Sequence, residues 1–395
     1  MAGRLPMGQK ELLRSKMLEM VKQQKMTLKA AVITLKVSYR QGIRLYAAYR
    51  EKGDAGLIHG NYGKKSNNIT AEKTSERALK AYRERYFDFG PTFASEKLAE
   101  EEGIHISVSV LRRLLIKSGD WQGSRRAREY RSRRERKACF GELIQFDGSH
   151  HKWFEERGPS CCLMTMIDDA TNTRLSRFFE GETIEAGMSV FSLWIMKYGI
   201  PEGLYCDKKN AFVLTREVTD AELLSGITEA KSHFGRACDK LGVQVISANS
   251  PQAKGRVERN HGVDQDRLVK ELRLAGISTI AEANKFLEKT YLPKMNKKFS
   301  RPAANPHDSH VPLGNIILKN IMCLEFGRTV GNDYVVRFET RLFQILKSNK
   351  NLPRSKDKVT IRVTLDGNLT ILSKGTKLLI KELTNMQYQK NRKVA

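Results

Sequence analysis

Three acidic residues, Asp147, Asp207 and Glu258, stand where they could support metal-dependent phosphoryl transfer. Asp147 closes the apolar run 142–147 and Asp207 closes the run 203–207, so both are predicted at strand ends. Open α/β sheets build their sites at strand ends. Three carboxylates can hold two Mg²⁺ ions, one for the attacking oxygen and one for the leaving oxygen of a phosphodiester. For any single acid taken alone, an ordinary surface role is the alternative.

Glu258 belongs to a segment, 250–274, whose pattern predicts a helix. Asn249 or Ser250 can cap this helix, and Pro251 suits its first turn. Glu258 then falls about two turns into the helix. The basic residues around it, which we expect to hold DNA phosphates, are Lys254, Arg256 and Arg259.

The segment 250–259 resembles the glutamate-bearing helix of DDE transposases and retroviral-type integrases, and the strongest likeness is to the ISNCY group of insertion-sequence transposases. The resemblance covers most of the chain in matching order. Its other matching segments are 145–149, 153–155, 167–171, 234–237 and 265–274.

The resemblance implies a fold and an activity. It implies an RNase H-like integrase catalytic core with a mixed sheet, in which Asp147, Asp207 and Glu258 are the catalytic residues and the metal ligands. Two Mg²⁺ ions are the implied cofactor, with Mn²⁺ as a substitute. The implied reaction is cleavage at the ends of an insertion sequence and 3′-OH strand transfer into target DNA. A homo-oligomer on double-stranded DNA, both terminal inverted repeats and target, follows because two ends must be handled together.

Two other acids compete for the role of first metal ligand. Asp168 and Asp169 are predicted at a hairpin turn after the second strand, and we assign the ligand to Asp147 instead. The segment between Asp207 and Glu258 is longer than in many relatives, which predicts an insertion at 214–231.

The sequence after Asp207 also departs from the wider family. Lys-Lys-Asn-Ala-Phe follows the aspartate where many relatives carry Asn-Gly, and Gln265 stands where many have Lys or Arg. The DNA contacts that relatives make through those positions are therefore not assigned to this chain.

Composition favours a nucleic-acid partner. The 395 residues include 70 Lys and Arg against 44 Asp and Glu, a net charge of +26, which attracts a polyanion. A basic membrane-surface role is the alternative, but the sequence has no apolar run of about eighteen residues and no amphipathic lipid-binding stretch. The first ten residues lack an apolar signal core, so we expect a bacterial cytoplasmic, nucleoid-associated protein whose cysteines stay reduced.

A zinc site is a second possible metal chemistry, at His150-His151 and Cys161-Cys162. The usual zinc spacings are missing, and neighbouring residues of a strand point to opposite faces. At most one residue of each pair could therefore face a shared ion, and we favour packing and surface roles.

Residues 1–56 predict a helix-turn-helix DNA-binding domain. A helical pattern at 9–24 precedes two segments, 27–38 and 39–50, and Ser38 would cap the second of these. An ordinary three-helix bundle is the alternative. The residues expected to meet bases or phosphates are Tyr39, Arg40 and Arg44, with Gln41 as a further candidate.

After a linker at 57–69, residues 70–118 predict a second helical, helix-turn-helix-like DNA-binding domain. Ser109 would cap its last helix, which carries Arg112 and Arg113 as candidates for DNA contact. Core packing alone explains the leucines of this helix. The three predicted helices lie at 70–87, 93–99 and 107–115.

A basic linker at 119–140 is expected to follow DNA phosphates. Its segment 124–137 has eight basic residues and two acids. A solvated charge run is the ordinary alternative. The arginines assigned to DNA are Arg125, Arg126, Arg133 and Arg134.

The rest of the chain changes character at Pro302. Residues 141–300 alternate between strand and helix patterns, which predicts an α/β layer. A linker at 301–330 leads to a small all-β barrel at 331–395, which serves in DNA binding, subunit assembly or as a structural cap. The strands expected there are 333–339, 341–346, 359–365 and 369–372.

Two other functions fit the same residues. A domesticated DNA-binding regulator could keep the fold without transposing, and an RNase H-like nuclease could cleave without strand joining. The intact acids argue against the regulator, and the two N-terminal readers argue against the nuclease.

Overall fold

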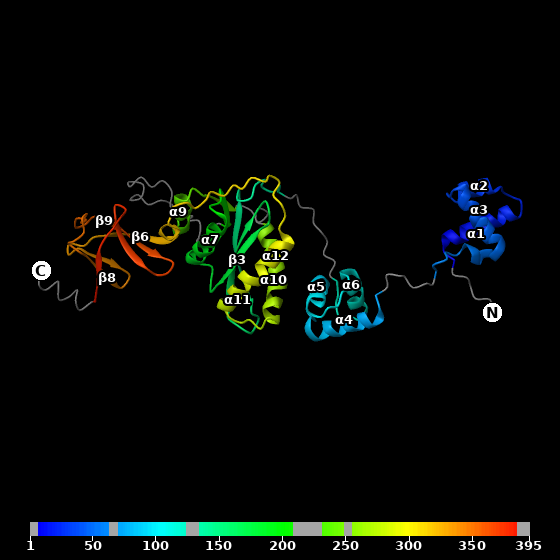
Figure 1. Cartoon of the computed structure of the whole chain (residues 1–395), viewed down its shortest axis with the longest axis horizontal. Helices are drawn as coiled ribbons and strands as arrows, with labels where there is room; N and C mark the ends of the chain where they lie inside the picture. The colour runs from blue at the N-terminus through cyan, green and yellow to red at the C-terminus, as the bar shows by residue number, and fades with distance from the viewer. Residues whose placement is uncertain (1–6, 63–69, 124–133, 208–230, 249–254, 385–395) are drawn as a thin grey trace. The chain divides into compact units, whose positions relative to one another are not determined.

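The computed structural model describes residues 7–62, 70–123, 134–207, 231–248 and 255–384. The chain divides into two units, residues 1–123 and 124–395. The first unit is entirely helical where it is described, and the second holds the sheets (Figure 1).

The first group of helices in unit 1 confirms the N-terminal helical prediction. Ser38 caps the third helix as expected, because its Oγ accepts a hydrogen bond from the Gln41 backbone N–H at 3.2 Å. Leu18, Leu45 and Leu57 form the core of the group. Its elements are α1 (Gln9–Lys22), α2 (Leu28–Thr34), α3 (Tyr39–Lys52) and the 3₁₀ turn Gly53–Leu57.

Helices α2 and α3 are in close contact at Gly42. A Cβ added to Gly42 would lie 2.1 Å from Cγ1 of Val32, which is buried. Ala31, the residue expected to permit the crossing, is also buried, but glycine is what the contact requires.

Replacing Gly42 with Ala is therefore expected to destabilise this helical group by about 1–2 kcal/mol. Overpacking costs about 1–3 kcal/mol, and the better helix propensity of Ala offsets up to about 1 kcal/mol. Hydrogen exchange of the α2 and α3 amides in the full chain should accelerate by about 5–30-fold. The exposed neighbour change Gln41→Ala is the control, and equal exchange in the two variants would contradict the prediction.

The second group of helices places its last cap differently from the prediction. Ser107, not Ser109, is the N-cap, because its extended backbone lets Oγ accept from the Val110 N–H at 3.4 Å. Ser109 already lies within the helix. The capping prediction for Ser109 is therefore wrong by two residues. The three helices are α4 (Glu72–Arg85), α5 (Pro91–Glu101) and α6 (Val108–Lys117).

Unit 2 contains a five-stranded mixed sheet in the order β3-β2-β1-β4-β5. The β1–β2 and β2–β3 pairs are antiparallel, whereas β1–β4 and β4–β5 are parallel. The prediction of an α/β core with a mixed sheet is confirmed. The strands are β1 (Ile144–His151), β2 (Cys161–Asp168), β3 (Arg174–Phe179), β4 (Gly203–Asp207) and β5 (Gln244–Ala248).

Helices cover both faces of this sheet (Figure 1). One apolar cluster joins Ile144 and Phe146 of β1 to the helices α7 and α9, and a second joins the opposite face to α10, α11 and α12. Side chains alternate along a strand, so Gln145 and Ser149 of β1 face α10 instead and bond to it. The helices are α7 (Ile184–Tyr198), α9 (His233–Lys240), α10 (Gly255–Leu274), α11 (Ile280–Phe286), a π-helical turn (Leu287–Tyr291) and α12 (Leu292–Phe299).

The C-terminal part of unit 2 is all-β, but a closed barrel is not confirmed. Its described strands form two sheets, ordered β11-β10-β9-β6 and β12-β8-β7. They share a core that includes Val336 and Phe343 of one sheet and Ile361 and Ile371 of the other. The strands are β6 (Cys323–Thr329), β7 (Val335–Phe338), β8 (Arg341–Ile345), β9 (Lys358–Thr364), β10 (Leu369–Ser373), β11 (Thr376–Lys377) and β12 (Ile380–Leu383).

Strand β6 lies in the stretch expected to be a linker, and it connects the β part to the core. Glu325 of β6 accepts from Lys240 Nζ of α9 at 2.7 Å and from Arg362 Nη2 of β9 at 3.0 Å. These two contacts hold the pKa of Glu325 below its ordinary value against the opposing effect of burial.

Candidate active site

The sheet brings Asp147 and Asp207 to neighbouring positions. In the parallel β1–β4 pair, Gln145 is the register partner of Tyr205, and each aspartate follows two residues later on its own strand. The Asp147 side chain on β1 is partly buried, with 18% of its surface exposed. Asp207 is the last residue of β4, at its carboxyl end. The strand-end prediction therefore holds for Asp207 only, because β1 continues past Asp147 to His151 through its antiparallel pairing with β2.

Helix α10, which carries Glu258, packs on the face of the sheet to which Asp147 belongs. Glu258 is exposed near the start of the described helix. One turn later, His261 Nδ1 lies 3.6 Å from Oδ2 of Asp147. Sequence reasoning missed His261, although its spacing of three residues from Glu258 puts it on a neighbouring part of the helix surface.

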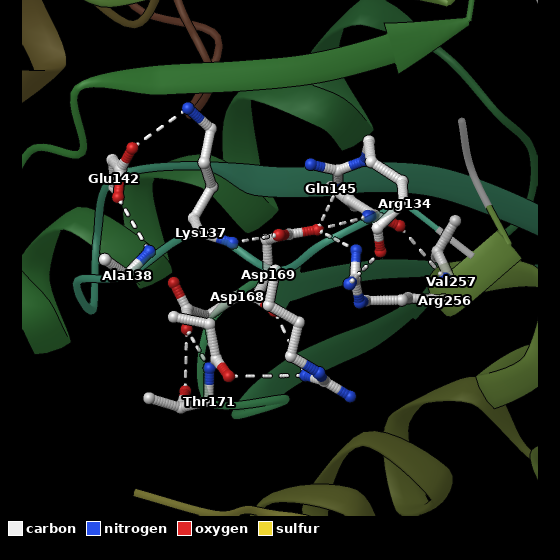
Figure 2. A network of polar contacts seen from close by, with 12 residues as sticks. Arg134, Lys137, Ala138, Glu142, Gln145, Asp168, Asp169, Thr171, Arg256 and Val257 are labelled. Carbon is white, nitrogen blue, oxygen red and sulfur yellow. Dashed lines mark hydrogen bonds and ion pairs between the residues drawn. The ribbon is translucent and has the colours of Figure 1, made fainter. Parts of the chain in front are cut away.

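Asp169 lies at the centre of a network between the sheet and α10 (Figure 2). It is fully buried and accepts hydrogen bonds from the Lys137 backbone N–H at 2.8 Å and from Gln145 Nε2 at 2.8 Å. The guanidinium groups of Arg134 and Arg256 also bond to its carboxylate. Asp169 is therefore surrounded by protein donors.

Asp168 has a separate set of partners. It is also fully buried, and it accepts from the Thr171 N–H at 2.6 Å, the Thr171 hydroxyl at 2.7 Å and the Gly141 N–H at 3.0 Å. Burial raises the pKa of Asp168, and these donors oppose that shift. Both acids of the predicted hairpin turn are thus fully buried and bond to protein groups, whereas Asp147 is 18% exposed and lies beside His261 of α10.

The predicted DNA-binding residues of unit 2 divide into three sets. The Arg256 guanidinium pairs with buried Asp169 and its side chain is 16% exposed, so it is bound largely within the protein. Arg259 is exposed on α10, and Arg134, beside Asp169, is 41% exposed. Residues that lie outside the described ranges are Arg125, Arg126, Arg133 and Lys254, together with the helix cap at 249–250 and most of the expected insertion at 214–231.

The predicted DNA-binding residues of unit 1 lie on helix surfaces. Tyr39, Arg40 and Arg44 are exposed in the first half of α3. Arg112 and Arg113 are exposed on α6, where the Arg112 guanidinium lies 5.9 Å from the centre of the Trp121 ring. Their side chains can therefore reach a ligand.

His150 and Cys162, one member from each pair weighed for zinc, do face a shared point together with Glu182. Their ligand atoms lie within 4.8 Å of one another. His150 Nε2 lies 3.6 Å from Glu182 Oε2, and burial raises the pKa of the Cys162 thiol to about 12. A contact between His150 and Glu182 beside a buried thiol explains this cluster without a metal.

Membrane insertion through a helix finds no support in the described part of the chain, where no helix is long and apolar enough to cross a bilayer.

The chain matches no family model, but it is similar to two curated proteins over most of its length. It is 35% identical over 380 residues to the candidate transposase y4bF of Sinorhizobium fredii, covering 95% of this chain and 81% of that protein. It is 30% identical over 418 aligned positions to the transposase for insertion sequence IS1202 of Streptococcus pneumoniae, covering 94% of this chain and 86% of that protein.

Solved integrase structures align with the chain more weakly. The HTLV-2 integrase catalytic core domain, in a trimeric form with magnesium, is 20% identical over 38% of this chain and 84% of its own, with a TM-score of 0.29. A chain of the simian T-cell lymphotropic virus intasome, solved in complex with the PP2A regulatory subunit B56 gamma, is 12% identical over 78% of this chain and 99% of its own, with a TM-score of 0.33. These scores are too low to support conclusions. The two transposases are similar over nearly the whole chain, and on their strength this chain belongs to the transposases of insertion sequences.

Proposed function

We propose that Asp147, Asp207 and Glu258 are the catalytic residues with which this transposase cleaves the ends of its insertion sequence and joins them to target DNA. The observation that carries the proposal is the placement of the first two at neighbouring positions of β1 and β4, with α10 packed on the face of Asp147. One helix and two adjacent strands thus supply the three acids. Metal-dependent phosphoryl transfer requires such convergence.

The acids fit a hard divalent cation. Carboxylate oxygens are the ligands that Mg²⁺ prefers, and Asp147 and Glu258 both retain exposure to solvent. Asp147 and Asp207 would hold two Mg²⁺ ions between them and Glu258 would complete the ligand set, with Mn²⁺ as a substitute. Mg²⁺ supplies the positive charge that stabilises both the attacking and the leaving oxygen.

The reaction has two steps of the same kind. In the first, a water oxygen attacks the phosphorus at the element end, and the bond from phosphorus to the 3′ oxygen breaks, which leaves a 3′ hydroxyl. In the second, that hydroxyl attacks a target phosphodiester and displaces its 3′ oxygen. The three acids would hold the Mg²⁺ ions, whose positive charge would attract and place the reacting phosphate in both steps.

The DNA-binding surfaces complete the proposal. We assign recognition of the terminal repeats to Tyr39, Arg40 and Arg44 of α3, with Arg112 and Arg113 of α6 as a second contact. Arg134 and Arg259 would contact phosphates near the cleavage site. Two ends must be joined in one event, so the working form is a homo-oligomer on DNA, in the nucleoid of a bacterial cell.

The test is an assay in which the full chain joins a labelled, pre-cleaved DNA end to a plasmid. Joining with Mg²⁺ or Mn²⁺, and none with EDTA or Ca²⁺, is the expected result. Cleavage without joined product in any buffer would favour a nuclease, and end binding without either reaction would favour a DNA-binding regulator.

A further inference from the structure

We propose that Asp169 is a positioning residue that fixes β1 against α10 and thereby sets the relation of Asp147 to Glu258. The inference rests on the catalytic assignment proposed above. It assigns a structural role to Asp169, which the sequence alone suggested only as a competing metal ligand.

The contacts of Asp169 reach both elements that carry the acids. Its Oδ1 accepts from Gln145 Nε2 of β1 at 2.8 Å and from the guanidinium of Arg256, in the first turn of α10 as described. Gln145 then closes a ring, because its Oε1 accepts from the Val257 backbone N–H at 3.2 Å (Figure 2). The Asp169 carboxylate and the Gln145 amide thus join β1 to α10, where their partners are the Arg256 guanidinium and the Val257 N–H.

The positions of these groups in the sequence make the ring relevant to catalysis. Gln145 lies two residues before Asp147 on the same face of β1. Arg256 and Val257 lie two residues and one residue before Glu258 on α10. A shift of β1 relative to α10 would break the ring and also change the separation of the two catalytic acids. Catalytic and metal-binding geometry tolerates little displacement, so this coupling would affect activity.

Burial makes the ring selective for one arrangement. Asp169 has no exposed surface, so any arrangement that removes a donor leaves a buried charge less well satisfied. A buried charge without its partners is costly, which favours the single geometry in which Gln145 and Arg256 both reach it.

The end of the basic linker is attached at the same carboxylate. Arg134 and the Lys137 backbone N–H bond to Asp169, and Arg136 Nη1 donates to its carbonyl oxygen at 3.0 Å. Residues 134–137, at the end of the basic linker, are therefore held at Asp169, the residue that positions the catalytic acids.

The test compares Asp169→Asn with Asp168→Asn in the full chain. Both variants replace a fully buried aspartate, but Asp168 bonds to the turn and to Gly141 rather than to Gln145 or Arg256. Asp169→Asn is expected to lower joining by about 10–100-fold and to raise the half-saturating Mg²⁺ concentration by about 10-fold, with DNA binding kept. Asp168→Asn is expected to lower the melting temperature while its Mg²⁺ dependence stays like that of the native chain.

A second variant covers the case in which Asp169→Asn does not fold. Gln145→Met keeps the volume of the side chain and leaves the Asp169 ion pairs in place, but it removes both hydrogen bonds of the amide. We expect it to fold and to raise the Mg²⁺ requirement in the same direction.

Two outcomes would overturn the proposal. One is that Asp169→Asn and Asp168→Asn lower joining equally with no change in Mg²⁺ dependence, and the other is that Gln145→Met keeps the native Mg²⁺ dependence. A Glu258→Gln variant that still joins DNA would refute the catalytic assignment instead, so the two failures can be told apart.

Discussion

Glu258→Gln is expected to lower DNA joining by about 10³-fold or more while end binding stays within about twofold of the native chain. Glutamine keeps the size of the side chain but removes the negative charge that a divalent cation needs. Glu258 is exposed, so the change should alter the free energy of unfolding by no more than about 0.5 kcal/mol. Joining is measured with the labelled, pre-cleaved end and plasmid, and binding with the same end in EDTA.

A matched control lies on the same helix. Asp266 is exposed on α10 and forms a surface pair with Lys270, so Asp266→Asn makes the same kind of charge change away from the sheet edge. Its joining should equal that of the native chain. Native joining by Glu258→Gln, or an equal loss in both variants, would show that Glu258 is not a catalytic residue.

The double change Arg40→Ala/Arg44→Ala is expected to weaken binding to the element ends by about 100-fold at moderate salt. Each arginine is exposed on α3, and a side-chain contact to a base edge or phosphate contributes about 1–3 kcal/mol. The slope of log affinity against log salt should fall by about two, because about two phosphate or base contacts are lost. Fluorescence anisotropy with a terminal-repeat duplex measures the affinity and its salt slope. The salt range is about 50 to 200 mM, over which such slopes are resolved.

Arg50 gives the control for charge. It is exposed in the last turn of the same helix, so Arg50→Ala removes one positive charge without touching the first half of α3. A loss of less than about threefold is expected for it. If the double variant bound the element end as tightly as Arg50→Ala does, α3 would not be the recognition helix, and an ordinary three-helix bundle would be the better interpretation.

The local sequence pattern was sufficient to predict features that depend only on residues close together in the chain. Ser38 caps α3 because an extended serine before an apolar-periodic segment bonds to an N–H three residues later. The same rule misplaced the cap of α6, since Ser107 and Ser109 are both plausible from local sequence and only the backbone path selects Ser107. In the β part, four strands were expected; the described residues add β6 and the short β11 and β12, and these strands lie in two sheets, so a closed barrel is not confirmed.

The acidic residues also divide into features that the sequence predicted and features that only the tertiary structure decided. The sequence by itself determined that Asp147 lies in a strand and Glu258 in a helix, because strand and helix periodicity are local properties, but it ended the strand at Asp147, whereas β1 continues to His151. The order of its motifs indicated the transposase family, to which the similarity to two transposases assigns the chain. Only the tertiary structure decided that Asp169 is buried against Arg256, a residue 87 positions away, and that His261 lies beside Asp147. Such contacts depend on which elements the sheet order and helix packing bring together, and no local pattern of side chains specifies that.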